Sequence, residues 1–252
     1  MRGSNDPLFF MDIKQASPLH QGKVKALFET GEPEELLMLF EDKVTAGNGA
    51  KEDFPIGKGA ICCSISTFLF NNIEANEVST HFIANPSPGA MIVKKLDIIP
   101  IEVVVRNYAA GSIVKDCGIE KGTEFRPCVI EPFLKDDSRN DPLLNWDRVR
   151  VMGYDVGQIV RPTIRINQIL TEIFDKCDID LIDFKLEFGH DSNGNLLLAD
   201  ELSPDGMRLW KKGTQENYDK DIFRDGSGDL LEGYKYILDS LSQIQSTDDT
   251  TD

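Results

Sequence analysis

The feature that most constrains the fold is a strand–turn–strand pattern between Leu181 and Glu201. Hydrophobic and charged residues alternate in its first half: the hydrophobic residues are Ile182, Phe184, Leu186 and Phe188, and the charged residues are Asp183, Lys185 and Glu187. This period of two predicts a strand with one buried face and one charged face. The pair Asn193-Gly194, which follows, is favoured in two-residue type I′ turns. The segment is therefore predicted to be a β-hairpin.

Two carboxylates of this hairpin form a candidate metal site. Folding the strands about Asn193-Gly194 places Glu187 directly opposite Asp200, with Cβ atoms about 5 Å apart. Carboxylates at that distance repel each other unless a cation or a shared proton relieves them, and hard oxygen ligands suit Mg²⁺. An ordinary solvated hairpin face would show the same alternation, because charged outer faces are common on antiparallel strands. The periodicity alone leaves both interpretations open.

The remaining patterns predict an α+β fold. Strand patterns occupy residues 23–29, 35–41, 90–96 and 101–105, and helical patterns occupy residues 59–72, the segment after Pro162 and residues 230–241. Residues 85–89 and 132–145 are rich in proline and polar residues and are predicted loops. Antiparallel strand signals with separate helices, without regular β-α-β alternation, favour an α+β architecture.

We expect two lobes with a boundary near residues 96–100. Residues 13–96 are predicted to form a β-rich N-terminal lobe, and residues 97–243 a larger α+β lobe with an antiparallel sheet. Residues 1–12 are predicted to be a flexible N-terminus. Residues 244–252 have few apolar anchors and are predicted to be a disordered acidic tail.

The composition excludes several classes of function. The 252 residues carry a formal net charge of −16, which repels phosphate backbones and anionic membranes, so we expect no nucleic-acid and no membrane partner. No stretch approaches the length of about 18 apolar residues that a membrane span needs, and the start lacks a secretory signal, so a cytoplasmic location is expected. The five cysteines form no Cys-x-x-Cys pair and are predicted to be buried free thiols. The histidines His20, His81 and His190 are predicted to be exposed or in turns.

Two lysines near the start of the chain are candidates for binding phosphate. Lys23 and Lys25 are predicted to project to the same side of a strand, just after Gly22, which lets backbone approach a ligand. Two ammonium groups beside a glycine turn suit a polyphosphate, although a Lys-x-Lys strand is usually solvent-facing. The chain lacks the Walker pattern Gly-x-x-x-x-Gly-Lys-[Ser/Thr], so a nucleotide would be held by another fold.

A second candidate anion site follows the β-branched run at residues 101–105. Arg106 stands at its end, and small residues lead to Ser112 at the start of a predicted helix. Free amides, a hydroxyl and a bidentate guanidinium suit a phosphate. A structural arginine at a sheet edge would give the same sequence. The turn after the hairpin presents Asp205 and Arg208, and such loops often carry function.

Residues 100–112 and 181–189 closely resemble the two signatures of the SAICAR synthetase family, and residues 200–210 fit the same family. The likeness extends from about residue 22 to residue 241. It implies an ATP-binding N-terminal lobe and a ligase that joins L-aspartate to the carboxylate of carboxyaminoimidazole ribonucleotide (CAIR). The products would be SAICAR, ADP and phosphate in purine biosynthesis. Phosphorylating the carboxylate would supply the leaving group that the aspartate amine displaces.

The resemblance also implies roles for individual residues. Glu187 and Asp200 would bind Mg²⁺. ATP would contact Gly22, Lys23, Lys25, Lys94, Ile98 and Lys135, with backbone hydrogen bonds to adenine from residues 94–98. CAIR would contact Arg106, Ser112, Lys185, Asp205 and Arg208. The residues implied to act in catalysis are Lys25, Lys135 and Lys185, which would neutralise charge during phosphoryl transfer.

Two other functions share parts of this pattern. A small-molecule or inositol-phosphate kinase would use the same lysine, carboxylate and Mg²⁺ groups, but would need extra basic residues around its acceptor. A non-catalytic nucleotide-binding module would bind ATP without turnover. One phosphate site in an acidic chain favours a mononucleotide substrate. The chain departs from the family at Asn48, where an aspartate is expected in many relatives, and a homo-oligomer is expected.

Overall fold

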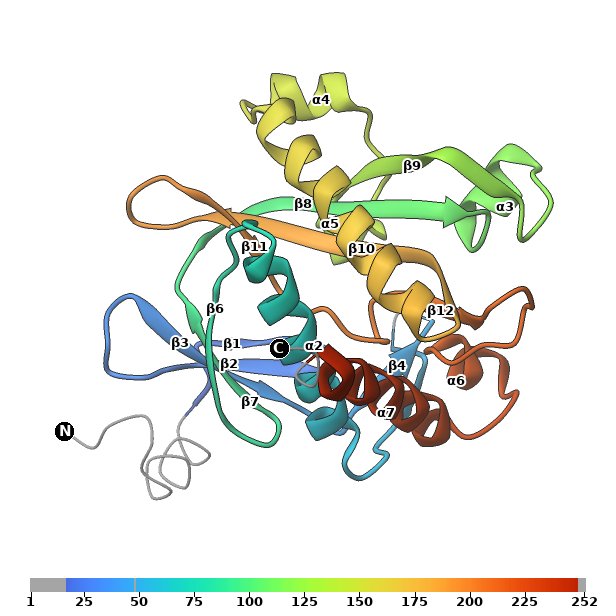
Figure 1. Cartoon of the computed structure of the whole chain (residues 1–252). Coiled ribbons are helices and arrows are strands. Elements are labelled where there is room, and N and C mark those ends of the chain that lie inside the picture. Colours follow the sequence, from blue (N-terminus) through green and yellow to red (C-terminus); the bar gives the residue numbers. More distant parts are fainter. Residues whose placement is uncertain (1–16, 48, 249–252) are drawn as a thin grey trace.

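Two five-stranded antiparallel sheets, a two-stranded one and the helices packed on them make up the part of the chain that the structure describes (Figure 1). The structure is a computed structural model that describes residues 17–47 and 49–248. The predicted flexible N-terminus at residues 1–12 and the departure at Asn48 therefore lie outside the described residues. The predicted α+β class with antiparallel sheets is confirmed.

The first sheet is built from residues before Asp97 and has the strand order β1-β2-β3-β7-β6. Its strands are β1 (His20–Gln21), β2 (Lys25–Glu29), β3 (Glu35–Phe40), β6 (Phe82–Ser87) and β7 (Ala90–Lys94). Helix α2 (Lys58–Ala75) contacts β3, β6 and β7. Of the four residues of its predicted apolar stripe, Ile65 and Leu69 are buried, and Ile61 and Phe68 are partly buried. A short hairpin of β4 (Val44–Ala46) and β5 (Lys51–Asp53) precedes this helix.

The second sheet carries the predicted hairpin and has the strand order β11-β10-β8-β9, with β12 also paired to β10. Its strands are β8 (Asp97–Tyr108), β9 (Glu124–Leu134), β10 (Ile179–His190), β11 (Leu196–Ala199) and β12 (Met207–Lys211). Helix α5 (Val156–Lys176) packs against β10. Apolar residues recur at spacings of three and four after Pro162, which predicts one buried face, and all five of them are buried: Ile166, Ile169, Leu170, Ile173 and Phe174.

Shorter helices and the C-terminal helix complete the fold. They are α3 (Ser112–Cys117), the 3₁₀ turn η1 (Asp137–Arg139), α4 (Trp146–Val151), α6 (Asp221–Asp225) and α7 (Leu230–Asp248). Helix α7 lies beside α2 and also contacts α5, so one hydrophobic core joins the two sheets. In the described ranges, no helix has the length and apolar character that crossing a membrane requires.

Several predicted boundaries are wrong, mostly at edge strands that contain proline. Residues 85–87 belong to β6 and residues 132–134 to β9, although both segments were predicted to be loops. Each strand lies at a sheet edge, where proline removes no ladder hydrogen bond that the sheet needs. Helix α5 begins six residues before Pro162, because the Asp155 carboxylate caps its first amides.

The ends of two further segments also differ from the prediction. The link predicted at residues 97–100 is the start of β8, which is a single strand as far as Tyr108. Helix α7 continues to Asp248, so the prediction of disorder is wrong for residues 244–248. Three cysteines are buried free thiols as predicted, whereas Cys117 is exposed and Cys128 is partly buried.

Candidate active site

The predicted hairpin forms, but its register differs by one residue. Glu187 pairs with Ala199 instead of Asp200. The loop spans five residues because the Asp191 carboxylate accepts the amides of Asn193 (3.0 Å) and Asn195 (2.8 Å), so the predicted two-residue turn is wrong. A one-residue shift in register exchanges the faces of a strand.

Asp200 nevertheless reaches the charged face because of its backbone conformation. It follows the last residue of β11 and has φ 65°, in the left-handed region that aspartate tolerates better than most residues. Its carboxylate Oδ2 lies 3.0 Å from Lys185 Nζ, and Glu187 Oε1 lies 2.6 Å from the same nitrogen. The structure therefore brings the two predicted metal ligands together around one ammonium group.

Lysines from three separate segments surround these two carboxylates. Lys25, at the start of β2, pairs with Asp200, and its Nζ lies 3.1 Å from Glu201 Oε1. Lys135, just after β9, pairs with Glu187. The three predicted catalytic lysines, Lys25, Lys135 and Lys185, thus meet at one ionic centre.

The electrostatics of this centre keep both kinds of group charged. Burial alone would raise the pKa of Asp200, but Lys185 and Lys25 outweigh it and hold that pKa well below its ordinary value. Burial alone would lower the pKa of Lys185, but Asp200, Glu187 and Glu102 outweigh it and raise that pKa well above its ordinary value. At neutral pH the centre is therefore a set of full charges that an incoming phosphate and cation can rearrange.

The donor set fits a Mg²⁺ ion that arrives with a phosphate-bearing substrate. Within the described residues, no three histidine, cysteine, aspartate or glutamate side chains are grouped so that they could hold a metal by themselves. Mg²⁺ is commonly held by one or two carboxylates plus substrate phosphates, and Glu187 and Asp200 supply two carboxylates. Lys185 already places a positive charge between them.

Sequence reasoning missed His81, which was predicted to be exposed. Its side chain is buried, packs edge-on against Phe70, and its Nε2 lies 2.9 Å from the carbonyl oxygen of Asp200. Burial lowers the pKa of His81 to about 4, so the ring is neutral at pH 7 and donates from Nε2–H to this carbonyl. His81 therefore supports the left-handed conformation that aims the Asp200 carboxylate.

Substituting His81 tests this support. We expect His81→Leu to raise the Mg²⁺ concentration needed for half-maximal activity by about 10-fold, the usual cost of removing a group that orients a metal ligand. His81→Gln keeps an N–H donor and should stay within about 3-fold of the wild type. Mg²⁺ titration of activity measures both, and equal effects of the two substitutions would show that the hydrogen bond is unimportant.

The predicted phosphate-binding residues converge on the buried carboxylate of Asp183. Arg106 Nη1 lies 3.0 Å from Asp183 Oδ2, and Arg208 Nη1 lies 2.8 Å from the same oxygen. Arg106 Nη2 donates to Ser112 Oγ at 3.0 Å. Gly111 has φ 65°, and a Cβ there would lie 2.8 Å from Arg208 Nη1, so the close approach requires glycine.

Two further carboxylates fix the arginines and were not predicted. Arg106 Nε lies 2.6 Å from Glu131 Oε2, and Arg208 Nε lies 2.8 Å from Asp221 Oδ2. Neither residue belongs to a recognisable motif, because β9 and the first turn of α6 reach the site through tertiary contacts. Each guanidinium is held at its Nε and Nη1 atoms, which orients it before any substrate binds.

Two residues that were predicted to contact the nucleotide, Lys23 and Lys94, make contacts within the protein. Gly22 and Lys23 lie in the turn between β1 and β2, so Lys23 does not share a strand with Lys25, and its Nζ lies 2.6 Å from Asp137 Oδ1. The amide of Lys94 donates to the His81 carbonyl at 2.7 Å.

The segment after Lys94 is also engaged within the protein. The amide of Lys95 donates to Glu34 at 2.8 Å, and Ile98 lies in β8 opposite Gly189. The amides of Lys94 and Lys95 are therefore engaged within the protein, and backbone hydrogen bonds from residues 94–98 to adenine stay a prediction.

Asp205, predicted to contact CAIR, is paired with Lys58 within the protein. The Lys58 side chain is buried, and Tyr234 donates to Asp205 Oδ1 at 2.8 Å. Lys58 Nζ also donates to the carbonyl of Lys43 at 3.0 Å. Sequence reasoning missed this pair, because a single lysine in the first turn of a helix has no characteristic spacing.

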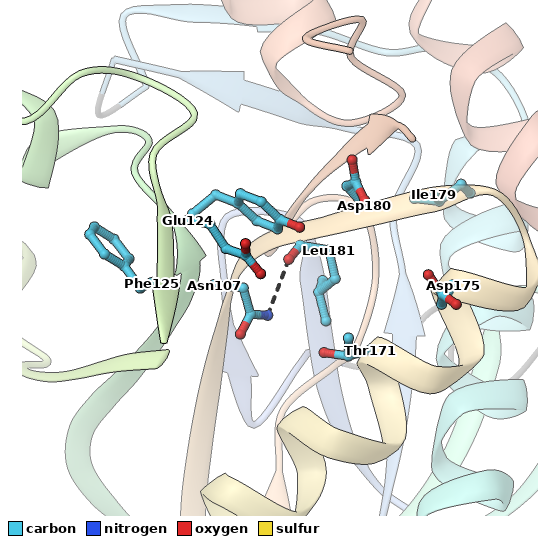
Figure 2. A pocket seen from close by; sticks show the side chains of 9 residues that line it. Asn107, Glu124, Phe125, Thr171, Asp175, Ile179, Asp180 and Leu181 are labelled. Carbon is cyan, nitrogen blue, oxygen red and sulfur yellow. Dashed lines mark hydrogen bonds between the residues drawn. The ribbon is translucent and has the colours of Figure 1, made fainter. Parts of the chain in front are cut away.

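A cavity of about 130 Å³ lies on the face of the second sheet that α5 covers, opposite the face that carries the ionic centre (Figure 2). It is lined by Asn107, Tyr108, Glu124, Phe125, Thr171, Asp175, Ile179, Asp180 and Leu181. Side chains alternate along β8, so Asn107 faces α5, where it contacts Asn167, while Arg106 faces the ionic centre. The cavity shares no lining residue with the ionic centre.

The two clusters of basic side chains, around Lys185 and around Asp183, suit an enzyme that brings a nucleotide and a second phosphorylated substrate together. A family model described as SAICAR synthetase matches residues 18–241. The chain is 41% identical over 231 residues to the phosphoribosylaminoimidazole-succinocarboxamide synthase of Staphylococcus aureus strain JH9, covering 90% of this chain and 99% of that protein. The chain therefore belongs to the SAICAR synthetase family, the ATP-dependent ligases of purine biosynthesis that join L-aspartate to CAIR.

Solved structures agree with this assignment. A SAICAR synthetase in complex with ADP superimposes with a TM-score of 0.86 at 38% identity, covering 89% of this chain and 97% of that one. The synthase from Ehrlichia chaffeensis gives a TM-score of 0.86 at 37% identity, covering 90% and 98%. The family assignment favours the ligase over the kinase that the sequence had left open.

Proposed function

We propose that the ionic centre around Lys185 is where ATP, Mg²⁺ and the CAIR carboxylate meet. The observation that carries this proposal is the convergence of Glu187 and Asp200 on one ammonium group, with Lys25 and Lys135 paired to the same two carboxylates. Glu187 and Asp200 would hold Mg²⁺, which when bound neutralises phosphate charge.

The lysines of the centre suit phosphoryl transfer to a carboxylate. Transfer places negative charge on the moving phosphoryl group and on the leaving oxygen, and fixed ammonium groups stabilise that charge. Lys25 and Lys135 approach from the first sheet and from the end of β9, so they can contact a phosphate chain from two sides. Lys185 lies between the metal-binding carboxylates and would face the CAIR carboxylate.

Arg106, Ser112 and Arg208 are proposed to bind the CAIR phosphate. Their side chains come together around Asp183, which supports this proposal, and a planar guanidinium binds phosphate with well-defined geometry. Asp205 would contact the imidazole of CAIR through a remaining lone pair of its carboxylate, whose two oxygens already accept from Lys58 and Tyr234. A cytoplasmic location and a homo-oligomer stay predictions from the sequence.

A coupled ADP-release assay tests the proposed function directly. We expect ADP to form at a substantial rate only when ATP, Mg²⁺, CAIR and L-aspartate are all present. ADP formation with CAIR alone, at a rate that aspartate does not change, would indicate a kinase. Nucleotide binding without ADP formation under all conditions would indicate a non-catalytic module.

Replacing Arg106 tests the phosphate site. We expect Arg106→Lys to raise the apparent KM for CAIR by about 10-fold, because it removes the planar guanidinium and keeps the charge. The KM for ATP should change by less than about 2-fold. Steady-state kinetics with each substrate varied provide the measurement, and the exposed Arg150→Lys is the matched control. An effect confined to ATP would contradict the assignment.

A further inference from the structure

One cation beside the active site has no partner. Six basic side chains of the site each pair with at least one carboxylate: Lys25, Lys58, Lys135, Lys185, Arg106 and Arg208. Lys220 is also partly buried, yet among the described residues its ammonium group makes neither a hydrogen bond nor an ion pair. A partly desolvated, unpaired charge is unfavourable unless a ligand compensates it.

Lys220 adjoins both halves of the substrate site. Its sequence neighbour Asp221 holds Arg208 Nε at 2.8 Å, which ties this segment to the proposed phosphate site. Burial lowers the pKa of Lys220, while the negative charge of Asp205 opposes this effect and Lys58 reinforces it, so Lys220 lies near the buried Lys58–Asp205 pair. The carbonyl of Gly206, next to Asp205, accepts the amide of Lys185 at 3.0 Å.

The anions of the reaction can be matched to the cations of the site. The polyphosphate has Lys25 and Lys135, and the ribonucleotide phosphate has Arg106 and Arg208. L-Aspartate brings two more carboxylates, for which these groups leave no cation. Lys220 is the basic side chain at the site that remains available.

We propose that the Lys220 ammonium group binds a carboxylate of L-aspartate and so selects a dicarboxylic amino acid as the nucleophile. This proposal rests on the proposed function. An ammonium group suits the task because it can meet a flexible carboxylate from several directions. Arg208, held by Asp183 and Asp221 next to Lys220, would keep the amino acid close to the ribonucleotide.

Steady-state kinetics of Lys220→Met, Lys220→Arg and the exposed control Lys235→Met test the proposal. We expect Lys220→Met to raise the KM for L-aspartate by about 30-fold and to leave the KM for ATP and CAIR within about 2-fold. Lys220→Arg should recover a large part of the loss, and Lys235→Met should resemble the wild type. Succinate, which has both carboxylates and no amine, should inhibit the wild type competitively against aspartate and should inhibit Lys220→Met about 30-fold less strongly.

The possible outcomes separate this inference from the proposed function. If the wild type forms ADP only with CAIR and aspartate, but Lys220→Met has an unchanged KM for aspartate, the inference is wrong and the function stands. A rise confined to the KM for CAIR would instead place Lys220 on the ribonucleotide. If Lys220→Met does not fold, Lys220→Gln replaces it, and equal succinate inhibition of Lys220→Gln and the wild type would overturn the proposal. A wild type that forms no ADP would reject the proposed function itself.

Discussion

Glu187→Gln is expected to lower kcat by about 1,000-fold while the protein stays folded. The amide cannot carry the negative charge that a divalent cation requires, and it leaves Lys185 and Lys135 without the carboxylate they share. Removing one preorganised charged group at a reacting centre typically costs 10²- to 10³-fold, about 3–4 kcal/mol. ADP release at saturating ATP, CAIR and aspartate measures the effect.

The fold and the metal dependence of this variant complete the test. Thermal unfolding should remain cooperative, and a Mg²⁺ titration should show a raised half-saturating concentration together with the lower kcat. Glu172→Gln, an exposed substitution on α5, is the matched control and should be neutral. Turnover of Glu187→Gln within about 5-fold of the wild type would reject the assignment of Glu187 as a metal ligand.

The parts of the fold that were predictable are those where a single period dominates. The alternation in residues 182–188 predicted β10, and the apolar spacing after Pro162 predicted the buried face of α5. Edge strands were harder to predict because β6 and β9 contain prolines, which favour loops in most sequence contexts. Whether proline is tolerated depends on the neighbouring strand, which local sequence does not specify.

The site shows the same division between local and tertiary information. Glu187 and Asp200 were predicted to lie together, and they do. The reason differs from the prediction: Glu187 pairs with Ala199, and the left-handed backbone conformation of Asp200 turns its side chain toward Glu187. His81 was missed because its polar sequence surroundings resemble a surface segment, whereas the fold buries it against Phe70. Glu131 and Lys220 were missed for a similar reason, since neither shows a pattern until distant segments pack together.

Lys58→Met is expected to lower the free energy of unfolding by about 3–5 kcal/mol at pH 7. Lys58 and Asp205 are both almost fully buried, and removing one partner leaves the other as an uncompensated charge. Methionine fills much of the lysine volume, so the effect reports on charge more than on packing. Urea unfolding of the wild type and the variant measures the difference.

The pH dependence of this loss follows from the pKa of Asp205. In the wild type, burial would raise that pKa, but the charges of Lys58 and Lys220 and the hydrogen bonds from Lys58 and Tyr234 outweigh it and lower it. Asp205 therefore adds stability above its ordinary pKa, and this stability is lost as pH falls through the lower folded value. Without Lys58, burial dominates and raises the pKa, so Asp205 destabilises the variant at pH 7 and does so less as acid protonates it. The difference between wild type and variant should therefore shrink from pH 7 to pH 5.

A second substitution separates the unpaired charge from other effects of Lys58→Met. Combining it with Asp205→Asn removes both charges and keeps an oxygen that can accept from Tyr234, so we expect the double variant to regain more than half of the lost stability. The double variant has no carboxylate at position 205, so it should also lack the pH-dependent part of the stability loss that Lys58→Met shows between pH 7 and pH 5. If the double variant is as unstable as Lys58→Met at pH 7, the loss comes from packing around α2 and not from the buried charge of Asp205.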